Sequence, residues 1–251
     1  MENTVTRIVA YGCSWTAGSE IMDHTSMGIS FDECNAIKKT YIKSNNSYAG
    51  MQKFYNTYNI TEQNESNYNN SWAGQIANKL NKPLDNRAIP GSGIDQIYFT
   101  LIRDYHAGKI LPTDLVLVGL TTIYRLIKFD EELHSLSLSH INDTGLIDLC
   151  NDDFIVYNYF KTLGLLASLK KHMNIRLQPI VPDINPYNES FQLQFNLSHT
   201  TDYAHGVWND IKDVMIAPDD YIENHLVGLI SIRCGFGHHP IESHTKLVEK
   251  I

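Results

Sequence analysis

Short apolar segments alternate with amphipathic segments along most of the chain. The run "RIVAY" at 7–11 is apolar and leads into Gly12, which predicts a buried strand. The run "DLVLVGL" at 114–120 shows no polar alternation, as expected for a strand buried on both faces of a parallel sheet. Two further strands are predicted at 84–89 and 175–181.

Segments with helical spacing separate these strands. Residues 71–81, "SWAGQIANKLN", place Trp72, Ile76 and Leu80 on one helical face, with Ser71 as the N-cap. Residues 94–108 show the same periodicity and end at a glycine. Other helices are predicted near 31–41, 154–172 and 219–232, and after "HHP" near the end of the chain. Alternating strands and helices predict an α/β protein with a mostly parallel sheet and right-handed crossovers.

Three polar tracts interrupt the alternation, at about 19–70, 128–152 and 183–218. The first is rich in Asn, Ser, Thr and Tyr, and its part at 45–70 has so few aliphatic residues that we expect an insertion with a mobile end. The third is predicted to be a loop with aromatic patches. We find no internal repeat and no interdomain linker, so we expect one domain, residues 1–251, that carries three insertions.

Composition excludes several classes of function. The formal net charge is -8, and Lys and Arg form no run beyond pairs, which argues against a nucleic-acid partner. No window approaches the roughly 18 apolar residues of a membrane span, and the first residues lack a signal peptide, so we expect a cytoplasmic protein. The four cysteines have no CxxC spacing and the histidines no ligand spacing, so we expect free thiols, no metal and no cofactor. Nothing in the sequence specifies an oligomeric state.

Ligands of parallel α/β sheets bind beyond the carboxyl ends of the strands. Here the predicted strands lead into "GCS" at 12–14, "NRAIPG" at 86–91 and "GLT" at 119–121, and "HHP" at 238–240 precedes the last helix. These short polar blocks are therefore the candidate site.

The blocks "GCSWTAG", "NRAIPGSG", "VGLT" and "HHPIESH" occur in the order of the SGNH hydrolases, or GDSL-type esterases, and the chain resembles that family over residues 8–244. The pattern of Gly-Cys-Ser, an aromatic residue and Thr, followed by N-x-A-x-x-G, is most similar to divergent members from bacteriophage and bacterial genomes. The resemblance implies a three-layer α/β/α sandwich with a mostly parallel, flavodoxin-like sheet.

The resemblance also implies roles for single residues. Ser14 matches the nucleophile and His239 the base, and the backbone N–H groups of Ser14 and Gly91 match oxyanion donors. Pro240 favours His239 over His238, because a proline in the first helical turn holds the preceding residue extended at the start of the helix. In the family a buried histidine often supports this loop, which implies a structural role for His244.

Two positions depart from the family pattern. Thr121 replaces the asparagine that is the third oxyanion donor, and its hydroxyl either donates to the oxyanion or satisfies backbone at the strand end. Phe236 stands where the family has the aspartate that orients the base. Asp219, Asp220, Glu242 or a backbone carbonyl can take that place, or the enzyme works with a Ser/His dyad.

The interpretation that follows is a serine esterase acting on small acyl esters, with O-acetyl groups on a carbohydrate as the expected substrate. Two alternatives stay open: an O-acyltransferase on the same scaffold, and a catalytically inactive SGNH-fold protein with a binding or structural role.

Arg125 either holds a substrate carboxylate or pairs with an acidic residue. Cys13, which replaces a family aspartate, is expected to be a buried thiol. The aromatic-rich segments 41–72 and 183–208 form either a substrate wall or packing within the insertions.

Overall fold

The computed structural model describes most of the chain. The described residues are 5–44, 47–61, 64–123, 125–129, 133–137, 151–180, 184–195, 197, 199–217 and 241–250, so the expected helix at 219–232 lies outside them. In chain order the elements are β1 (Arg7–Tyr11), α1 (Ser14–Ala17), α2 (Asp23–Met27), α3 (Phe31–Ser44), α4 (Ser47–Tyr58), α5 (Glu65–Asn70), α6 (Trp72–Lys79), β2 (Leu84–Asn86), α7 (Ile94–His106), β3 (Asp114–Leu120), β4 (Arg125–Phe129), β5 (Leu133–Ser137), α8 (Asp152–Ser168), β6 (Asn174–Pro179), α9 (Glu189–Gln194), α10 (Thr201–Ile211) and α11 (Ile241–Lys250).

Within the described residues, four parallel strands form one sheet in the order β2-β1-β3-β6. Strand β1 lies between β2 and β3, with Ala10 opposite Asn86 and Tyr11 opposite Val118. This sheet confirms the predicted α/β class with a parallel, flavodoxin-like strand order. A separate antiparallel hairpin, β4 and β5, follows β3 and overlaps the tract at 128–152 that the sequence indicates only as a polar insertion.

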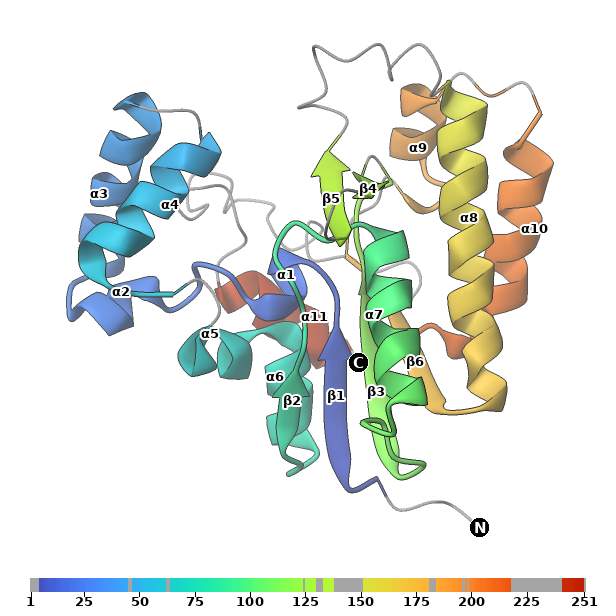
Figure 1. The fold of residues 1–251 in the computed structure, drawn as a ribbon, viewed down its shortest axis with the longest axis horizontal. Helices are drawn as coiled ribbons and strands as arrows, with labels where there is room; N and C mark the ends of the chain where they lie inside the picture. Colours follow the sequence, from blue (N-terminus) through green and yellow to red (C-terminus); the bar gives the residue numbers. More distant parts are fainter. Residues whose placement is uncertain are drawn as a thin grey trace.

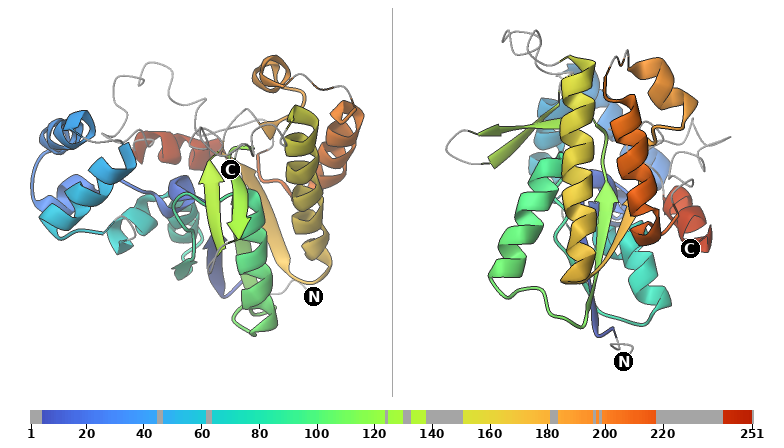
Figure 2. Two further views of the ribbon diagram at one scale, coloured as in Figure 1. Left: turned by 45° about the horizontal axis from the view of Figure 1, so that its top comes forward. Right: turned by 90° about the vertical axis from the view of Figure 1, so that its right-hand side faces the viewer.

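Helices cover both faces of the sheet. Figure 2 shows α7 and α8 on one side of the strands and α6 and α11 on the other. Parallel strands require this arrangement, because each right-handed crossover must carry a helix back over the sheet. The first crossover, from β1 to β2, and the second, from β2 to β3, run in opposite directions across the sheet. Their helices α6 and α7 therefore lie on opposite faces.

The pattern of apolar residues predicts the core well. Strand β3 is buried on both faces, as its unbroken apolar sequence indicates. In α6, Trp72 and Ile76 are buried on the predicted face, and the hydroxyl of Ser71 caps the helix by accepting from the N–H of Gly74 at 3.2 Å. Leu80 does not join this face: it is the C-cap residue, where the helix has ended, and it is 46% exposed.

Two glycines at neighbouring strand ends make room for one threonine of α1. Gly12 follows β1 and Gly119 lies near the end of β3. A methyl group added at these positions would lie 2.2 Å and 2.0 Å, respectively, from Oγ1 of Thr16, which is fully buried. We call Gly12 and Gly119 the glycine notch. It lets α1 begin directly at the strand ends, because a side chain at either position would push the helix away.

Helices α2, α3 and α4 form a helical lobe beside the β2 edge of the sheet (Figure 1). The helix near 31–41 is confirmed as α3, and the tract at 45–70, expected to be an insertion, is largely helical where it is described. Its described residues form α4 and α5, and α4 packs against α3. Aromatic rings take the place of the missing aliphatic residues, since Phe54 and Tyr55 are buried with Cys34 in a cluster of their own.

A buried ion-pair cluster joins the helical lobe to the segment after α1. Nζ of Lys38, which is 1% exposed, lies 2.9 Å from a carboxylate oxygen of Glu20 and 2.9 Å from one of Asp23. The hydroxyl of Tyr55 also donates to Asp23. Burial alone would lower the pKa of Lys38, but the charges of the two carboxylates outweigh burial and raise it above its ordinary value. The lysine is therefore charged, and removing one member of such a cluster typically costs about 3–5 kcal/mol.

The tract at 183–218 contains two helices, so the prediction of a loop was wrong. Ala204, Trp208 and Ile211 are buried at helical spacing in α10, which packs along α8. Oδ1 of Asp153 in α8 accepts from the N–H of Thr200 at 3.0 Å and from its hydroxyl at 2.7 Å. These bonds fix the start of α10. The i, i+4, i+7 spacing of Ala204, Trp208 and Ile211 is the signal in the sequence that could have predicted α10.

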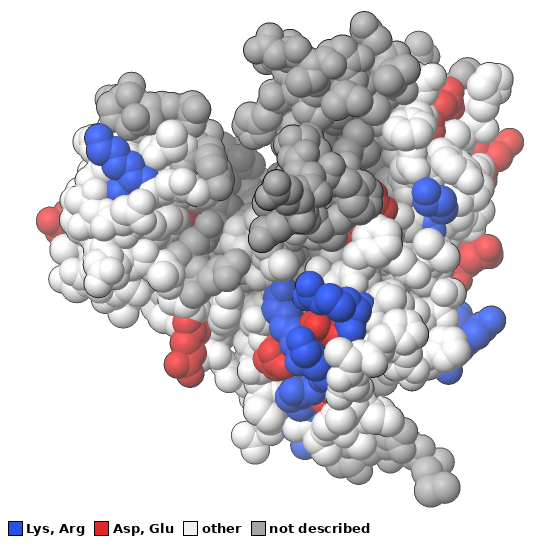
Figure 3. Space-filling model, viewed as in Figure 1, with Lys and Arg blue, Asp and Glu red and all other residues white. Residues whose placement is uncertain are grey.

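Opposite charges cluster between β2 and α7, where Figure 3 shows Lys and Arg side chains gathered around acidic ones. Arg7 pairs with Asp114 at 2.6 Å, and Arg87 pairs with Asp104 at 3.1 Å. Burial alone would raise the pKa of Asp104, but the hydrogen bond from Tyr11 and the charge of Arg87 hold it below its ordinary value. The carboxylates are therefore ionised at neutral pH, and their charges are neutralised by arginines of the same chain.

Substitution of Gly119 by alanine is expected to destabilise the protein, because the new methyl group would overlap Oγ1 of Thr16. Overpacking of this kind costs about 1–3 kcal/mol, which urea unfolding will detect as a lower free energy of unfolding. In a Thr16→Ala background the same change is expected to cost little, since the overlapping oxygen is gone. The control is Gly206→Ala in α10, where a methyl group meets no atom within 4 Å. Equal losses at Gly119 and Gly206 would contradict the role of the glycine notch.

Candidate functional site

The carboxyl ends of β1, β2 and β3 meet at one edge of the sheet, because the strands are parallel. Ser14 is the first residue of α1, Gly91 lies in the loop after β2, and Thr121 directly follows β3. Three of the residues that the sequence singles out therefore lie at the same edge. His239 lies outside the described residues, and the described chain resumes at Ile241, the first residue of α11.

Ser14 lies in a buried turn and is 4% exposed. Cys13, the extended N-cap residue of α1, is a buried free thiol, as predicted. The carbonyl of Ser14 accepts from the N–H of Ser19 at 2.9 Å, which closes the turn after α1. Within the described part of the chain, neither the hydroxyl nor the backbone N–H of Ser14 forms a hydrogen bond. No described residue therefore holds the hydroxyl or the N–H of Ser14 away from a ligand.

Gly91 lies in a tight turn that only glycine fits comfortably. The N–H of Ser92 donates to the carbonyl of Ile89 at 3.1 Å and closes the turn over Pro90 and Gly91. The φ of Gly91 is 83°, the left-handed value that a type II turn requires at its third residue. A methyl group there would meet no atom within 4 Å, and its N–H donates to no acceptor among the described residues. Gly91 therefore presents an N–H that no described residue accepts from.

One asparagine fastens the α1 turn to the loop after β2. Nδ2 of Asn86 donates to the carbonyl of Thr16 at 3.0 Å, and its Oδ1 accepts from the N–H of Ala88 at 3.0 Å. The N–H of Ile89 donates to the carbonyl of Gly12 at 2.9 Å. Together these bonds set the position of one loop relative to the other. The sequence contains Asn86 in the block N-x-A-x-x-G, but the spacing alone does not indicate that its amide joins two loops.

Thr121 is fully buried and held by two neighbours. Its carbonyl accepts from the hydroxyl of Tyr159 at 2.8 Å, and its Oγ1 accepts from Nη1 of Arg125 at 3.2 Å. The same Nη1 donates to the carbonyl of Ser92 at 3.2 Å. Arg125 thus bridges the end of β3 and the loop that contains Gly91. One of the two roles expected for Arg125 was an ion pair with an acidic residue. Among the described residues, Arg125 pairs with no carboxylate.

His244 in α11 is buried and joins this helix to α6. Its Nδ1 accepts from the backbone N–H of Trp72 at 3.1 Å, which satisfies one of the N–H groups that the first turn of α6 leaves without an intrahelical partner. This contact agrees with the structural role expected of His244. Glu242, one candidate for the carboxylate that the family has near its histidine, is exposed on α11.

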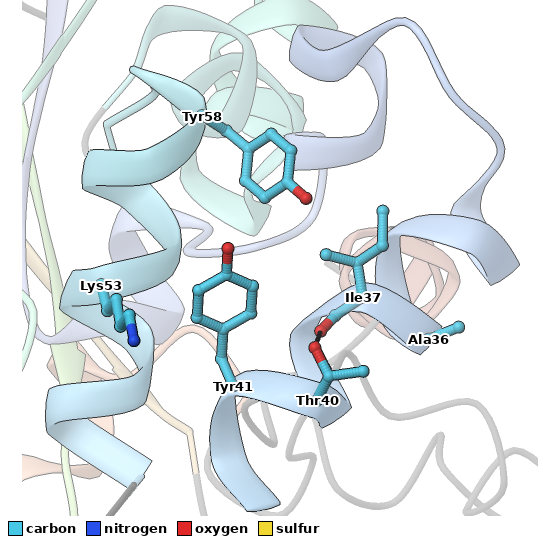
Figure 4. Close-up of a pocket in the computed structure, with 6 residues that line it drawn as sticks. All are labelled: Ala36, Ile37, Thr40, Tyr41, Lys53 and Tyr58. Atoms are coloured by element: carbon cyan, nitrogen blue, oxygen red, sulfur yellow. Dashed lines mark hydrogen bonds between the residues drawn. The ribbon is translucent and has the colours of Figure 1, made fainter. Parts of the chain in front are cut away.

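A pocket of about 550 Å³ lies on the helical lobe, apart from the residues at the strand ends (Figure 4). Tyr41 of α3 and Tyr58 of α4 line it, and the hydroxyl end of Tyr41 points toward the ring of Tyr58. The two ring centroids are 6.4 Å apart, and Lys53 stands at the side of the pocket. The pocket contains none of the candidate catalytic residues.

Two further kinds of site were sought in the described ranges. There, His, Cys, Asp and Glu side chains do not gather in groups of three or more that could hold a metal ion. None of the described helices combines the length and the apolar character that crossing a bilayer requires.

Comparisons with known proteins give a structural likeness. No protein-family model matches the sequence, and no curated protein matches it. The chain is similar to the structure of a member of the lipolytic protein G-D-S-L family from Veillonella parvula, with a TM-score of 0.45 and 11% identity, over 98% of this chain and 96% of that one. It is also similar to a protein described as a GDSL-like lipase from Parabacteroides merdae, with a TM-score of 0.46 and 12% identity, over 99% and 97% of the two chains. The likeness is thus nearly full-length at low sequence identity.

Replacement of Asn86 by aspartate tests the link between the two loops. The variant keeps the acceptor for Ala88 but loses the donor to Thr16 and places a negative charge beside that carbonyl. We expect the free energy of unfolding, measured in urea, to fall by about 1–3 kcal/mol. Asn78→Asp on the exposed face of α6 is the matched control and is expected to change it by less than about 0.5 kcal/mol. Similar small changes in both variants would show that Asn86 does not hold the loops.

Proposed function

We propose that this chain is a serine esterase of the SGNH type that cleaves small acyl esters, with O-acetyl groups on carbohydrates as the substrate class. Ser14 is the nucleophile and His239 the general base. The backbone N–H groups of Ser14 and Gly91, together with the hydroxyl of Thr121, hold the oxyanion.

The reaction proceeds through an acyl-enzyme. Oγ of Ser14 attacks the acyl carbon while His239 takes the hydroxyl proton, and the carbonyl oxygen becomes negative in front of the three donors. The bond from the acyl carbon to the alcohol oxygen then breaks, and His239 returns the proton to the leaving alcohol. Water, activated by the same histidine, cleaves the ester bond to Ser14 and releases the acid. The scheme uses no metal and no cofactor.

The observation that carries this proposal is that the N–H groups of Ser14 and Gly91 donate to no acceptor among the described residues. Acyl transfer needs a free hydroxyl beside N–H donors that are fixed before the reaction, since donors that must reorient stabilise the oxyanion less. Here Asn86 and the glycine notch fix the two loops that carry them. Each such donor typically contributes about 3–4 kcal/mol to transition-state stabilisation, so two donors rank with the nucleophile in importance.

Exposed aromatic rings support the carbohydrate part of the proposal. Tyr41 and Tyr58 line the pocket on the helical lobe (Figure 4). Tyr58 is 38% exposed. Aromatic faces of this kind offer an apolar surface to the apolar face of a sugar ring, while the hydroxyl of tyrosine offers a polar group. Tyr41 and Tyr58 lie within the segment 41–72, one of the two expected to form either a substrate wall or packing within the insertions.

Labelling by a fluorophosphonate probe and hydrolysis of p-nitrophenyl acetate test the nucleophile. We expect the wild-type chain to show both, and Ser14→Ala to lose the label and roughly 10⁴-fold or more of kcat. The matched control is Ser19→Ala, because Ser19 is a buried serine of the same turn whose hydroxyl has no described hydrogen-bond partner. If the folded wild-type chain shows neither reaction, the esterase proposal fails. Ester formation with an added alcohol would instead indicate an acyltransferase.

The base is tested by comparing neighbouring histidines. His239→Ala is expected to lower kcat by roughly 10⁴-fold or more, since the serine hydroxyl then has no proton acceptor. His238→Ala is the matched control and is expected to keep kcat within about tenfold of the wild-type value, as a residue that only adjoins a catalytic base would. Both are measured with p-nitrophenyl acetate on chains that give the wild-type circular dichroism spectrum. A larger loss at position 238 would assign the base to His238.

A further inference from the structure

Arg125 contacts both of the loops that carry the proposed oxyanion donors outside α1. Its Nη1 donates to the carbonyl of Ser92, the residue after Gly91, and to Oγ1 of Thr121, each at 3.2 Å. Neither partner is charged, and no carboxylate among the described residues pairs with this guanidinium. The contacts of Arg125 with described residues therefore all lie within the candidate site.

The surroundings of Arg125 leave it little freedom to move. A methyl group on Gly93 would lie 2.5 Å from the carbonyl oxygen of Arg125, so its backbone packs directly on the loop after Gly91. On the other side, Thr121 is fully buried, and the hydroxyl of Tyr159 holds its carbonyl. The arginine thus connects two anchored segments.

The direction of the hydrogen bond limits where the proton of Thr121 can point. A guanidinium has only donors, so Oγ1 of Thr121 must accept from Arg125 and turn its own O–H away from it. Within the described part of the chain that O–H donates to no acceptor. A hydroxyl that accepts from a cation is also a stronger donor, because the charge polarises its O–H bond. Arg125 therefore supplies the fixed direction that a threonine hydroxyl lacks by itself.

We propose that Arg125 is a positioning residue that aims the hydroxyl of Thr121 at the oxyanion and ties the end of β3 to the loop of Gly91. This inference rests on the proposed esterase function. It explains how a threonine can work at a position where the resemblance implies an asparagine: the pair of Thr121 and Arg125 does together what a fixed side-chain amide does alone. It also separates Arg125 from the role of a substrate-carboxylate holder, which requires an anionic substrate.

A double-mutant cycle on p-nitrophenyl acetate hydrolysis tests the proposal. Thr121→Val removes the hydroxyl at nearly constant volume, and Arg125→Met removes the donors but keeps an apolar stem. We expect each change to lower kcat roughly tenfold to a hundredfold with little change in KM, as loss of a donor that acts mainly in the transition state does. Combined, they are expected to lower kcat little more than the worse single change, because Arg125 acts through Thr121.

Two controls keep the result interpretable. Arg103→Met replaces an arginine that is 71% exposed and pairs with Asp104 of its own helix, and it is expected to leave kcat unchanged. Arg125→Lys keeps the charge and loses the planar fork, so it serves in the cycle if Arg125→Met does not fold; it is expected to restore part of kcat.

The outcomes separate this inference from the proposed function. If the wild-type chain is active and depends on Ser14, but the effects on kcat at positions 121 and 125 multiply independently or Arg125→Met leaves kcat unchanged, the inference fails and the esterase stands. A change in KM alone would also overturn it, because a residue that aims an oxyanion donor acts mainly in the transition state. If the wild-type chain has no Ser14-dependent activity, both proposals fail together.

Discussion

The packing of Thr16 into the glycine notch is the contact on which the geometry of the candidate site depends. Parallel strands bring their carboxyl ends to one edge, but they do not decide how close the next segment can come. Gly12 and Gly119 let α1 start against the backbone of two strands, with Thr16 filling the space where two side chains would be. The hydroxyl of Thr16 has no hydrogen-bond partner among the described residues, which typically costs about 1–3 kcal/mol. Close packing at this point is therefore kept despite an unpaired buried group.

A series of hydrogen bonds that begins at Thr16 positions the loops of the candidate site. The carbonyl of Thr16 holds Asn86, Asn86 holds the loop after β2, and that loop reaches Arg125 through Ser92. In each of these hydrogen bonds, a planar side-chain group, an amide or a guanidinium, bonds to a backbone group whose position is fixed. The hydrophobic core sets where the strands lie, and this chain of hydrogen bonds sets where the donors point. Together, the core and these hydrogen bonds explain how residues far apart in the sequence can act at one site.

The sequence predicts the parts of the fold that have a clear period. The unbroken apolar run of β3, the spacing in α7 and the Ser71 cap of α6 each follow from local rules, and the strand-end rule places Ser14, Gly91 and Thr121 at one edge. The helix α4 escapes prediction because its buried positions are aromatic residues, whereas α10 is missed although its buried residues follow a helical spacing.

The contacts of Asn86 and Arg125 escape prediction for another reason. An amide or a guanidinium can bond to any nearby carbonyl, so only the tertiary fold selects the partner. Neither spacing nor composition in the sequence carries that information. His239 lies outside the described residues, and its assignment stays a prediction.

The buried cluster of Lys38, Glu20 and Asp23 limits how this chain can diverge. A sequence that loses Lys38 first would leave two carboxylates without a cation in the interior, and one that loses both carboxylates would leave an ammonium group without an anion. Neutral intermediates between the charged set and an apolar one are therefore rare. Relatives that share the helical lobe should either keep all three charges or have exchanged them as a set, so covariation at these positions would identify which distant sequences carry the same lobe.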